Sequence, residues 1–74
     1  MPRAAHRLRV GKTLRQLRLA RGWTQEELAA RAGLHPTYVG GIERGERNVG
    51  LDNLINLARA LREHPSVLFS EISK

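Results

Sequence analysis

The sequence predicts an all-α fold in which five short helices surround one core. Apolar residues recur at spacings of three and four along most of the chain, and most glycines and prolines stand between these stretches. No stretch reads convincingly as a strand. The chain has 74 residues, of which 41% are hydrophobic but only 4% aromatic. We therefore expect one compact domain over residues 1–74 with a mostly aliphatic core.

The first helix is predicted over residues 6–20, and Gly22 follows its end. Its apolar positions repeat at helical spacing and form one inward stripe. This stripe consists of Val10, Leu14, Leu17 and Arg21.

The second helix has the strongest start signal in the chain. Thr24 and Glu27 stand three residues apart, the spacing of a capping box in which each side chain bonds the other residue's backbone N–H. Trp23 and Leu28 flank this cap at the positions of a hydrophobic staple. The helix is therefore predicted over residues 25–31.

Three further helices are predicted in the second half of the chain. One covers residues 36–43 and opens on Pro36, whose missing N–H would be unpaired in the first turn anyway. Another covers residues 51–61, and a short last helix covers about 65–72. The inner stripe of the fourth helix is predicted to be Leu51, Leu54, Ile55, Ala58 and Leu61.

The composition excludes several classes of protein. Without cysteine, the chain has neither a disulfide nor a thiolate metal site. His6, His35 and His64 lie too far apart for ligand spacing, and no Ser-His-Asp set or phosphate-binding glycine loop is present. We expect no metal, cofactor, small-molecule ligand or enzymatic activity. No apolar run reaches the roughly 18 residues of a membrane span and no signal peptide is found, so a cytoplasmic protein is expected.

The charge favours a polyanionic partner. Thirteen Lys and Arg residues against seven Asp and Glu give a net charge of +6, and most of the cations are Arg. A guanidinium group makes paired hydrogen bonds to phosphate and to the edge of guanine. Two short helices joined by a glycine-containing turn, over about residues 24–44, are typical of a helix-turn-helix. Double-stranded DNA is therefore the expected partner.

Residues 10–61 resemble the Cro and lambda-repressor type of helix-turn-helix, the Xre-like family of bacterial and phage regulators. The resemblance rests on Gly22-Trp23-Thr24-Gln25-Glu26-Glu27-Leu28-Ala29, Ala32-Gly33-Leu34, Tyr38-Val39, Ile42-Glu43-Arg44-Gly45 and Arg47-Asn48. It implies a lambda-repressor-like domain whose third helix enters the major groove. Within the family, the chain is most similar to the controller proteins of restriction–modification systems.

The resemblance also implies a set of DNA-binding residues. Thr37 would contact a base or a phosphate, Arg44 a guanine or a phosphate, and Gln25 would fix a phosphate at a helix N-terminus. The full set is Gln25, His35, Pro36, Thr37, Tyr38, Gly41, Arg44, Arg47 and Asn48. Arg18 and Glu43 match a family pair expected to join the first and third helices as a structural ion pair.

The sequence departs from the controllers at two positions. They commonly carry Arg where this chain has Pro36, and Ser where it has Gly40. Losing that Arg removes a residue that could bond an edge of guanine with two hydrogen bonds, so either direct specificity is weaker or recognition shifts to Thr37 and Arg44. The adjacent glycines, Gly40 and Gly41, each cost roughly 1 kcal/mol of helix stability relative to Ala. A close approach of backbone to DNA or to another helix would justify this cost, but tolerated drift remains an alternative.

Two surfaces carry further expectations. The N-terminal cations Arg3, Arg7, Arg9 and Lys12 either contact DNA or form a solvated helix face. The last helix carries more apolar side chains than the edge of a monomer buries, which predicts a homodimer interface. Its expected members are Val67, Phe69 and Ile72.

These observations predict a transcription regulator that binds a palindromic operator as a homodimer. A phage-type repressor is one alternative. Another is an antitoxin whose main partner is a toxin protein, although the sequence shows no disordered tail for such a partner. RNA binding is disfavoured because the chain offers almost no aromatic stacking platform.

Overall fold

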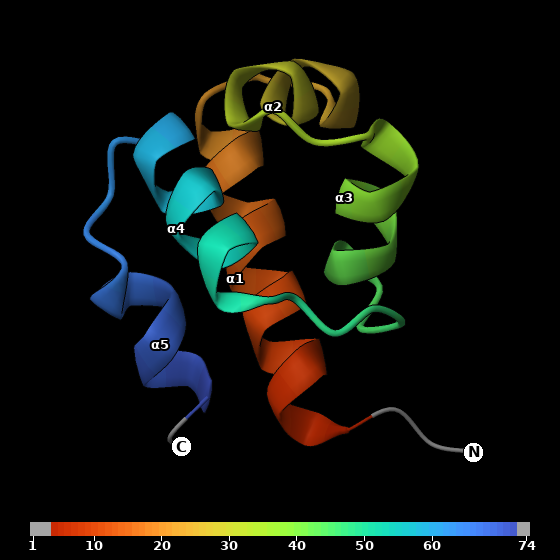
Figure 1. Ribbon diagram of the computed structural model, residues 1–74, viewed down its shortest axis with the longest axis vertical. Coiled ribbons are helices and arrows are strands. Elements are labelled where there is room, and N and C mark those ends of the chain that lie inside the picture. Colours follow the sequence, from red (N-terminus) through yellow and green to blue (C-terminus); the bar gives the residue numbers. More distant parts are fainter. Residues whose placement is uncertain (1–3, 73–74) are drawn as a thin grey trace.

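The computed structural model describes residues 4–72, and within them the chain forms five helices and no strand. The helices are α1 (Ala5–Ala20), α2 (Gln25–Ala32), α3 (Pro36–Glu43), α4 (Leu51–Ala60) and α5 (Ser66–Ile72). Helix α1 runs through the middle of the molecule and α2 crosses its C-terminal end (Figure 1). Helix α3 lies on one side of α1, and α4 and α5 lie on the other. The predicted all-α, five-helix fold is confirmed.

The helix ends agree with the predicted ones to within one residue because local signals set them. The hydroxyl of Thr24 accepts from the backbone N–H of Glu27 at 3.1 Å, and the Thr24 N–H donates to the Glu27 carboxylate at 3.3 Å. This completes the expected capping box at the start of α2. Gly33 ends α2 with a φ of +71°, the left-handed backbone that glycine adopts without strain.

The core is aliphatic, as the composition predicts. Its fully buried large side chains are Val39, Ile42, Leu14, Leu28, Leu54, Leu57, Leu61 and Leu68. Trp23 and Tyr38 pack only partly against this cluster, and Phe69 remains 39% exposed. Helices α1 to α4 each contribute at least two buried residues, so one continuous core holds the domain together.

The predicted inner stripe of α4 is partly wrong. Leu51 is 60% exposed, Ile55 is only half-buried, and Leu57, which the stripe omits, is 1% exposed. The side chains that face the core are Leu54, Leu57, Ala58 and Leu61. Periodicity gives the apolar face of a helix but does not show where its first turn extends beyond the neighbouring helices.

Gly11 marks a close crossing of α1 and α3. A Cβ atom at this position would lie 2.3 Å from the carbonyl oxygen of Ile42 and 2.6 Å from that of Glu43. These neighbours are backbone atoms, so the clash can be relieved only by moving one helix away from the other. The sequence alone does not reveal this role of Gly11, because a glycine inside a helical stripe carries no sign of what crosses it.

Substitution Gly11→Ala is expected to lower the free energy of unfolding by about 1–3 kcal/mol, as overpacking does. The loss occurs even though Ala is the better helix former by roughly 1 kcal/mol. Urea denaturation followed by circular dichroism measures it. Gly50→Ala is the control because its methyl group meets no atom within 4 Å. Equal stability of the two variants would contradict the close crossing.

Candidate nucleic-acid interface

The turn between α2 and α3 fixes the angle of the two helices. After Gly33, the N–H of Leu34 donates to the Ala29 carbonyl at 2.8 Å and closes the end of α2. Ala29 is fully buried, and its small side chain lets the two helices pack closely. Helix α3 buries Val39 and Ile42 in the core. Its opposite face is therefore presented outward.

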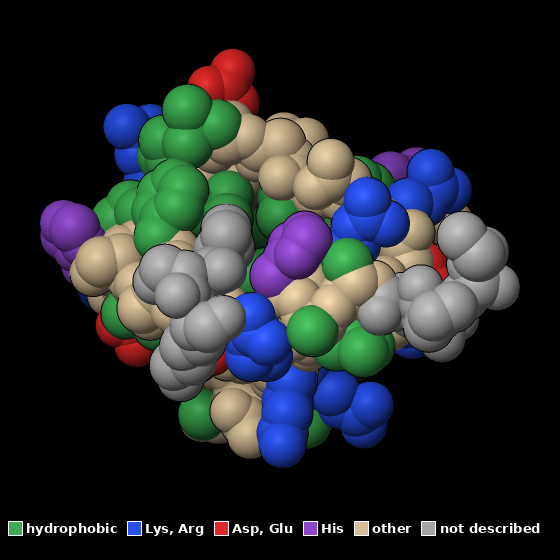
Figure 2. Space-filling model, turned by 90° about the horizontal axis from the view of Figure 1, so that it is seen from below, with side chains coloured by type: hydrophobic (Ala, Val, Ile, Leu, Met, Phe, Trp, Pro, Cys, Tyr) green, Lys and Arg blue, Asp and Glu red, His purple; other side chains and the backbone are tan. Residues whose placement is uncertain are grey.

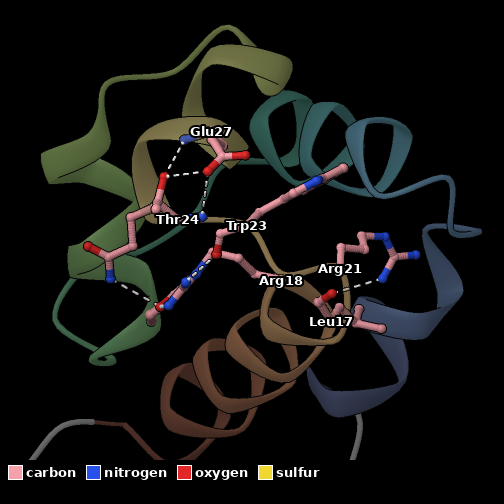
Figure 3. Close-up of polar contacts among 8 residues, drawn as sticks. Leu17, Arg18, Arg21, Trp23, Thr24 and Glu27 are labelled. Carbon is pink, nitrogen blue, oxygen red and sulfur yellow. Dashed lines mark hydrogen bonds and ion pairs between the residues drawn. The ribbon is translucent and has the colours of Figure 1, made fainter.

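A buried polar network ties α3 to α1 and α2. The Arg18 guanidinium donates to both carboxylate oxygens of Glu43, at 2.7 and 2.9 Å, and to the carbonyl of Trp23 at 2.8 Å. The side-chain amide of Gln25 donates to the same carboxylate at 3.1 Å. The expected pair of Arg18 and Glu43 is thus present, with side chains only 9% and 3% exposed. Figure 3 shows the side chain of Arg18 extending from α1 toward α3.

The network also explains the protonation of Arg18. Its hydrogen bond to Glu43 is the largest effect and raises the pKa of Arg18 above the usual value, although burial acts in the opposite direction. The ion pair therefore favours the charged form of the Arg18 guanidinium. Gln25, assigned to phosphate by the resemblance, is held here by its amide nitrogen, which leaves its carbonyl oxygen near Gly40.

The start of α3 is built by His35 and Pro36. The His35 ring caps the helix by accepting from the Thr37 N–H through Nδ1 at 3.1 Å. Pro36 occupies the first helical turn, as predicted. Thr37 is exposed, so its hydroxyl and methyl group are free to face a base edge.

Tyr38 has a different environment from its neighbours. It is half-buried against the core, and its hydroxyl donates to the Asn48 carbonyl at 3.4 Å while accepting from the Asn53 amide at 3.3 Å. These bonds link α3 to the following loop and to α4. In this conformation Tyr38 positions the loop that carries Arg47 and Asn48.

The two glycines of α3 lie beneath side chains of the same chain. A Cβ at Gly40 would come 2.9 Å from the Arg44 guanidinium and 3.1 Å from the Gln25 carboxamide. A Cβ at Gly41 would come 2.4 Å from Cγ of Arg47. Both glycines are buried, so neither presents bare backbone to a partner. Instead they leave room for three of the polar side chains assigned to DNA.

Substitution Gly41→Ala is expected to displace Arg47 and to weaken binding to all DNA sequences by a similar factor. If Arg47 contacts a phosphate, the slope of log K against log salt should fall by about one. Titrations of specific and unrelated duplexes over a range of salt concentrations measure this. Arg47→Ala should have the same effect, and the double variant should bind no more weakly than either single variant. If Gly41→Ala bound DNA normally while Arg47→Ala did not, the position of Arg47 on DNA would not depend on Gly41.

Arg44, at the C-terminal end of α3, is exposed and pairs with Glu46 at 3.1 Å. The pair is open to solvent, with side chains 54% and 39% exposed, so it adds little stability. A guanidinium in a weak surface pair can exchange its carboxylate for a guanine edge or a phosphate. Arg44 and Thr37 thus stand at opposite ends of the outer face of α3.

The loop after α3 joins the N-terminal part of α1. Arg47 and Asn48 are exposed there and, with His6 and Arg7, line a small cavity of about 30 Å³. The Nε atom of Arg7 is buried and has no hydrogen-bond partner within the described residues. Arg7 is therefore the N-terminal cation that the fold brings to the loop assigned to DNA.

The other N-terminal cations differ in place. Arg9 donates from Nε to the Glu71 carbonyl at 3.0 Å and so joins α1 to α5. Lys12 is exposed on α1, and Arg3 lies outside the described residues. The fold thus separates Arg7, Arg9 and Lys12, which the sequence groups together with Arg3.

Helix α5 carries the residues expected at a dimer interface. Val67 is half-buried and Phe69 is 39% exposed, whereas Leu68 faces the core. The side chain of Ile72 lies outside the described part of the chain. Seen from below, a group of hydrophobic side chains lies at the upper left of the view, and several Lys and Arg side chains lie at the bottom and on the right (Figure 2). None of the helices in residues 4–72 is both long and apolar enough to cross a bilayer.

Comparison with known proteins agrees with this geometry. A helix-turn-helix family profile matches residues 14–68, which include α2, α3 and α4 entirely. The chain belongs to the Cro/CI-type, Xre-like helix-turn-helix family. This helix-turn-helix protein is 46% identical over 63 residues to the control protein C.BamHI of Bacillus amyloliquefaciens, covering 84% of this chain and 78% of that one.

Two further relatives carry similar names. The control protein C.SmaI of Serratia marcescens is 48% identical over 52 residues, which cover 70% of this helix-turn-helix protein and 62% of the relative. The crystal structure of the restriction-modification controller protein C.AhdI from Aeromonas hydrophila superposes with a TM-score of 0.87 at 50% identity. That match covers 89% of this chain and all of C.AhdI. The predicted likeness to the controllers is therefore confirmed.

Proposed function

We propose that this protein is a sequence-specific transcription regulator that binds a palindromic operator as a homodimer, in the manner of a restriction–modification controller. The observation that carries the proposal is the rigid presentation of α3. The bonded set of Arg18, Gln25 and Glu43 fixes this helix, while Thr37 and Arg44 face outward at its two ends. Its expected places of action are the cytoplasm and the chromosome.

Two groups of residues and the net charge of the chain have distinct tasks in this proposal. Thr37 and Arg44 read base edges in the major groove. Arg47, Asn48 and the N-terminus of α2 contact phosphates and set the register of the protein on the duplex. Because non-specific affinity comes from charge, the net charge of +6 brings the protein to any DNA before α3 selects a site.

Selection of genomic fragments by the purified protein at about 150 mM salt tests the function, because non-specific binding is weak in this range. We expect a palindrome upstream of the protein's own gene, beside genes for a methyltransferase and a nuclease. A palindrome at an unrelated promoter would instead favour a phage-type repressor. Recovery of no sequence above background would contradict the proposal, and co-purification of a toxin protein would then support the antitoxin.

The homodimer is tested separately at α5. Phe69→Asp places a charge on the proposed interface and is expected to raise the dimer dissociation constant by about 30-fold or more, as loss of a buried aromatic anchor does. Sedimentation equilibrium measures the effect. The matched control is Leu19→Asp, because Leu19 is 52% exposed on α1. If Phe69→Asp left the dimer dissociation constant unchanged, α5 would not form the dimer interface.

A further inference from the structure

A hollow of about 320 Å³ opens where the C-terminal ends of α1, α2 and α4 meet. We call it the Trp23 hollow. It is lined by Arg21, Trp23, Arg31, Ala60, Leu61 and Arg62. Its walls combine the Trp23 indole and the Ala60 methyl group with three guanidinium groups, while the Leu61 side chain is fully buried. None of these residues belongs to the set assigned to DNA.

Arg21 forms a fixed wall of the Trp23 hollow. Its guanidinium donates to the carbonyl of Leu17 at 2.8 Å and also to the carbonyl of Leu61. It also lies 3.6 Å from the carboxylate of Glu63. Figure 3 shows Arg21 beside Trp23, with its bond to Leu17. The guanidinium of Arg21 therefore has its partners within the protein, so Arg21 shapes the wall of the hollow and contributes little unpaired charge.

Arg31 and Arg62 supply the unpaired charge. The Arg31 guanidinium stacks over the Trp23 ring at 4.2 Å, which holds it at the hollow through a cation–π contact. Within the described residues, neither Arg31 nor Arg62 forms an ion pair or a side-chain hydrogen bond. Two guanidinium groups thus stand at one concave site without an acidic partner.

The backbone of Arg62 is a second, independent sign of function. Four described residues have left-handed φ angles: three are glycines that follow α1, α2 and α3, and the fourth is Arg62, at +56° after α4. A glycine would adopt this conformation without the strain that a side chain causes. Backbone stability alone would favour Gly here, so a use of the Arg62 side chain would account for the Arg.

The shape and place of the Trp23 hollow favour a protein partner over DNA. Helix α2 separates the hollow from α3: α4 packs on one side of α2 and α3 on the other (Figure 1). A duplex presents its phosphates on a convex surface, whereas this concave site places the Trp23 ring and Ala60 beside guanidinium groups, an arrangement that suits the methylene stem and the carboxylate of one side chain. Arg and Trp are also the residue types that anchor protein interfaces most often.

We propose that the Trp23 hollow binds an Asp or Glu side chain from an acidic segment of a partner protein. The carboxylate would pair with Arg31 and Arg62, and its aliphatic stem would pack on Trp23 and Ala60. Paired guanidinium–carboxylate bonds give such a contact both strength and orientation. This surface leaves α3 free, so the acidic partner and DNA can be bound together.

The only tryptophan of the chain lies in the hollow and reports binding directly. We would titrate the protein with blocked hexaglutamate at about 150 mM salt, where long-range attraction is screened. Saturable change in Trp23 emission is expected, and none with blocked hexaglutamine. Arg31→Gln and Arg62→Gln should each weaken binding by about ten-fold, the loss of one charged pair. Arg59→Gln, an equal change of charge on exposed α4 surface, should weaken it by less than about two-fold.

Arg62→Gly separates binding from stability. It should unfold at the same or a higher temperature than the wild type, because the strained backbone is relieved, yet bind hexaglutamate as weakly as Arg62→Gln. Absence of an emission change, or an equal loss in Arg59→Gln, would overturn the proposal. A loss of operator binding in Arg31→Gln and Arg62→Gln, with hexaglutamate binding intact, would assign the hollow to DNA instead.

Discussion

Replacement of Arg18 by Met is expected to lower the free energy of unfolding by about 3–5 kcal/mol, as loss of one partner from a buried ion pair does. Glu43 would keep a carboxylate that is 3% exposed, and only the Gln25 amide would remain bonded to it. The carbonyl of Trp23 would lose its donor as well. Urea denaturation followed by circular dichroism measures the change.

Two controls define what the loss means. Arg18→Met with Glu43→Leu should recover much of the stability, because no uncompensated charge is then buried. Arg44→Met should change stability by less than about 1 kcal/mol, since its pair with Glu46 is exposed. If Arg18→Met were as stable as Arg44→Met, the network would not hold α3.

The pH dependence of this contribution follows from the raised pKa of Arg18. A group whose pKa is higher in the folded state contributes fully below its unfolded pKa and loses that contribution only as pH rises through the folded value. Arg18 stays charged far above neutrality in both states. Its stabilising effect should therefore be constant across the neutral range.

The double variant Thr37→Ala, Arg44→Ala is expected to lose most of the discrimination between the operator and unrelated DNA. Each side chain is exposed on the outer face of α3, and a base contact is worth about 1–3 kcal/mol of discrimination. The two substitutions together should therefore reduce the specificity ratio by roughly 30-fold to 25,000-fold. Competitive titration with operator and scrambled duplexes at one salt concentration measures the ratio.

Loss of charge alone must be separated from loss of recognition. Arg59→Ala removes one positive charge from α4, outside the proposed interface, and should leave the specificity ratio unchanged. Full discrimination by the double variant would show that other residues read the operator. Gln25, the residue matched to phosphate, would not account for it, because phosphate contacts carry no base information.

Local signals in the sequence predict much of this fold. Thr24 and Glu27 set the start of α2, Pro36 sets the start of α3, and glycines close the ends of α1 and α2. Each signal acts over one or two helical turns, so reading it requires no knowledge of the rest of the chain. The pairing of Arg18 with Glu43 spans 25 positions, and it was expected only through the family resemblance.

Features that depend on crossing helices were not predictable in this way. Gly11 is required by carbonyl groups on α3, and Gly41 by the stem of Arg47. Leu51 fits the apolar period of α4 but meets no neighbouring helix that covers it. The four N-terminal cations look alike in sequence, yet Arg7 lies at the loop and Arg9 bonds α5. Only the three-dimensional arrangement separates these roles.

The central position of α1 has a mechanical consequence for the proposed dimer. On one side α1 is locked to α3 by the crossing at Gly11, and on the other its Arg9 is bonded to α5. Helix α1 thus fixes the distance between α5, which carries the proposed dimer interface, and α3, the reading helix proposed to enter the major groove, in each protomer. The separation of the two reading helices, which must match about one 34 Å turn of the duplex, would then be a rigid property of the protein. Loops would tune contacts within a half-site, whereas changes in α1, in its two contacts or in the α5 interface would alter the spacing between half-sites.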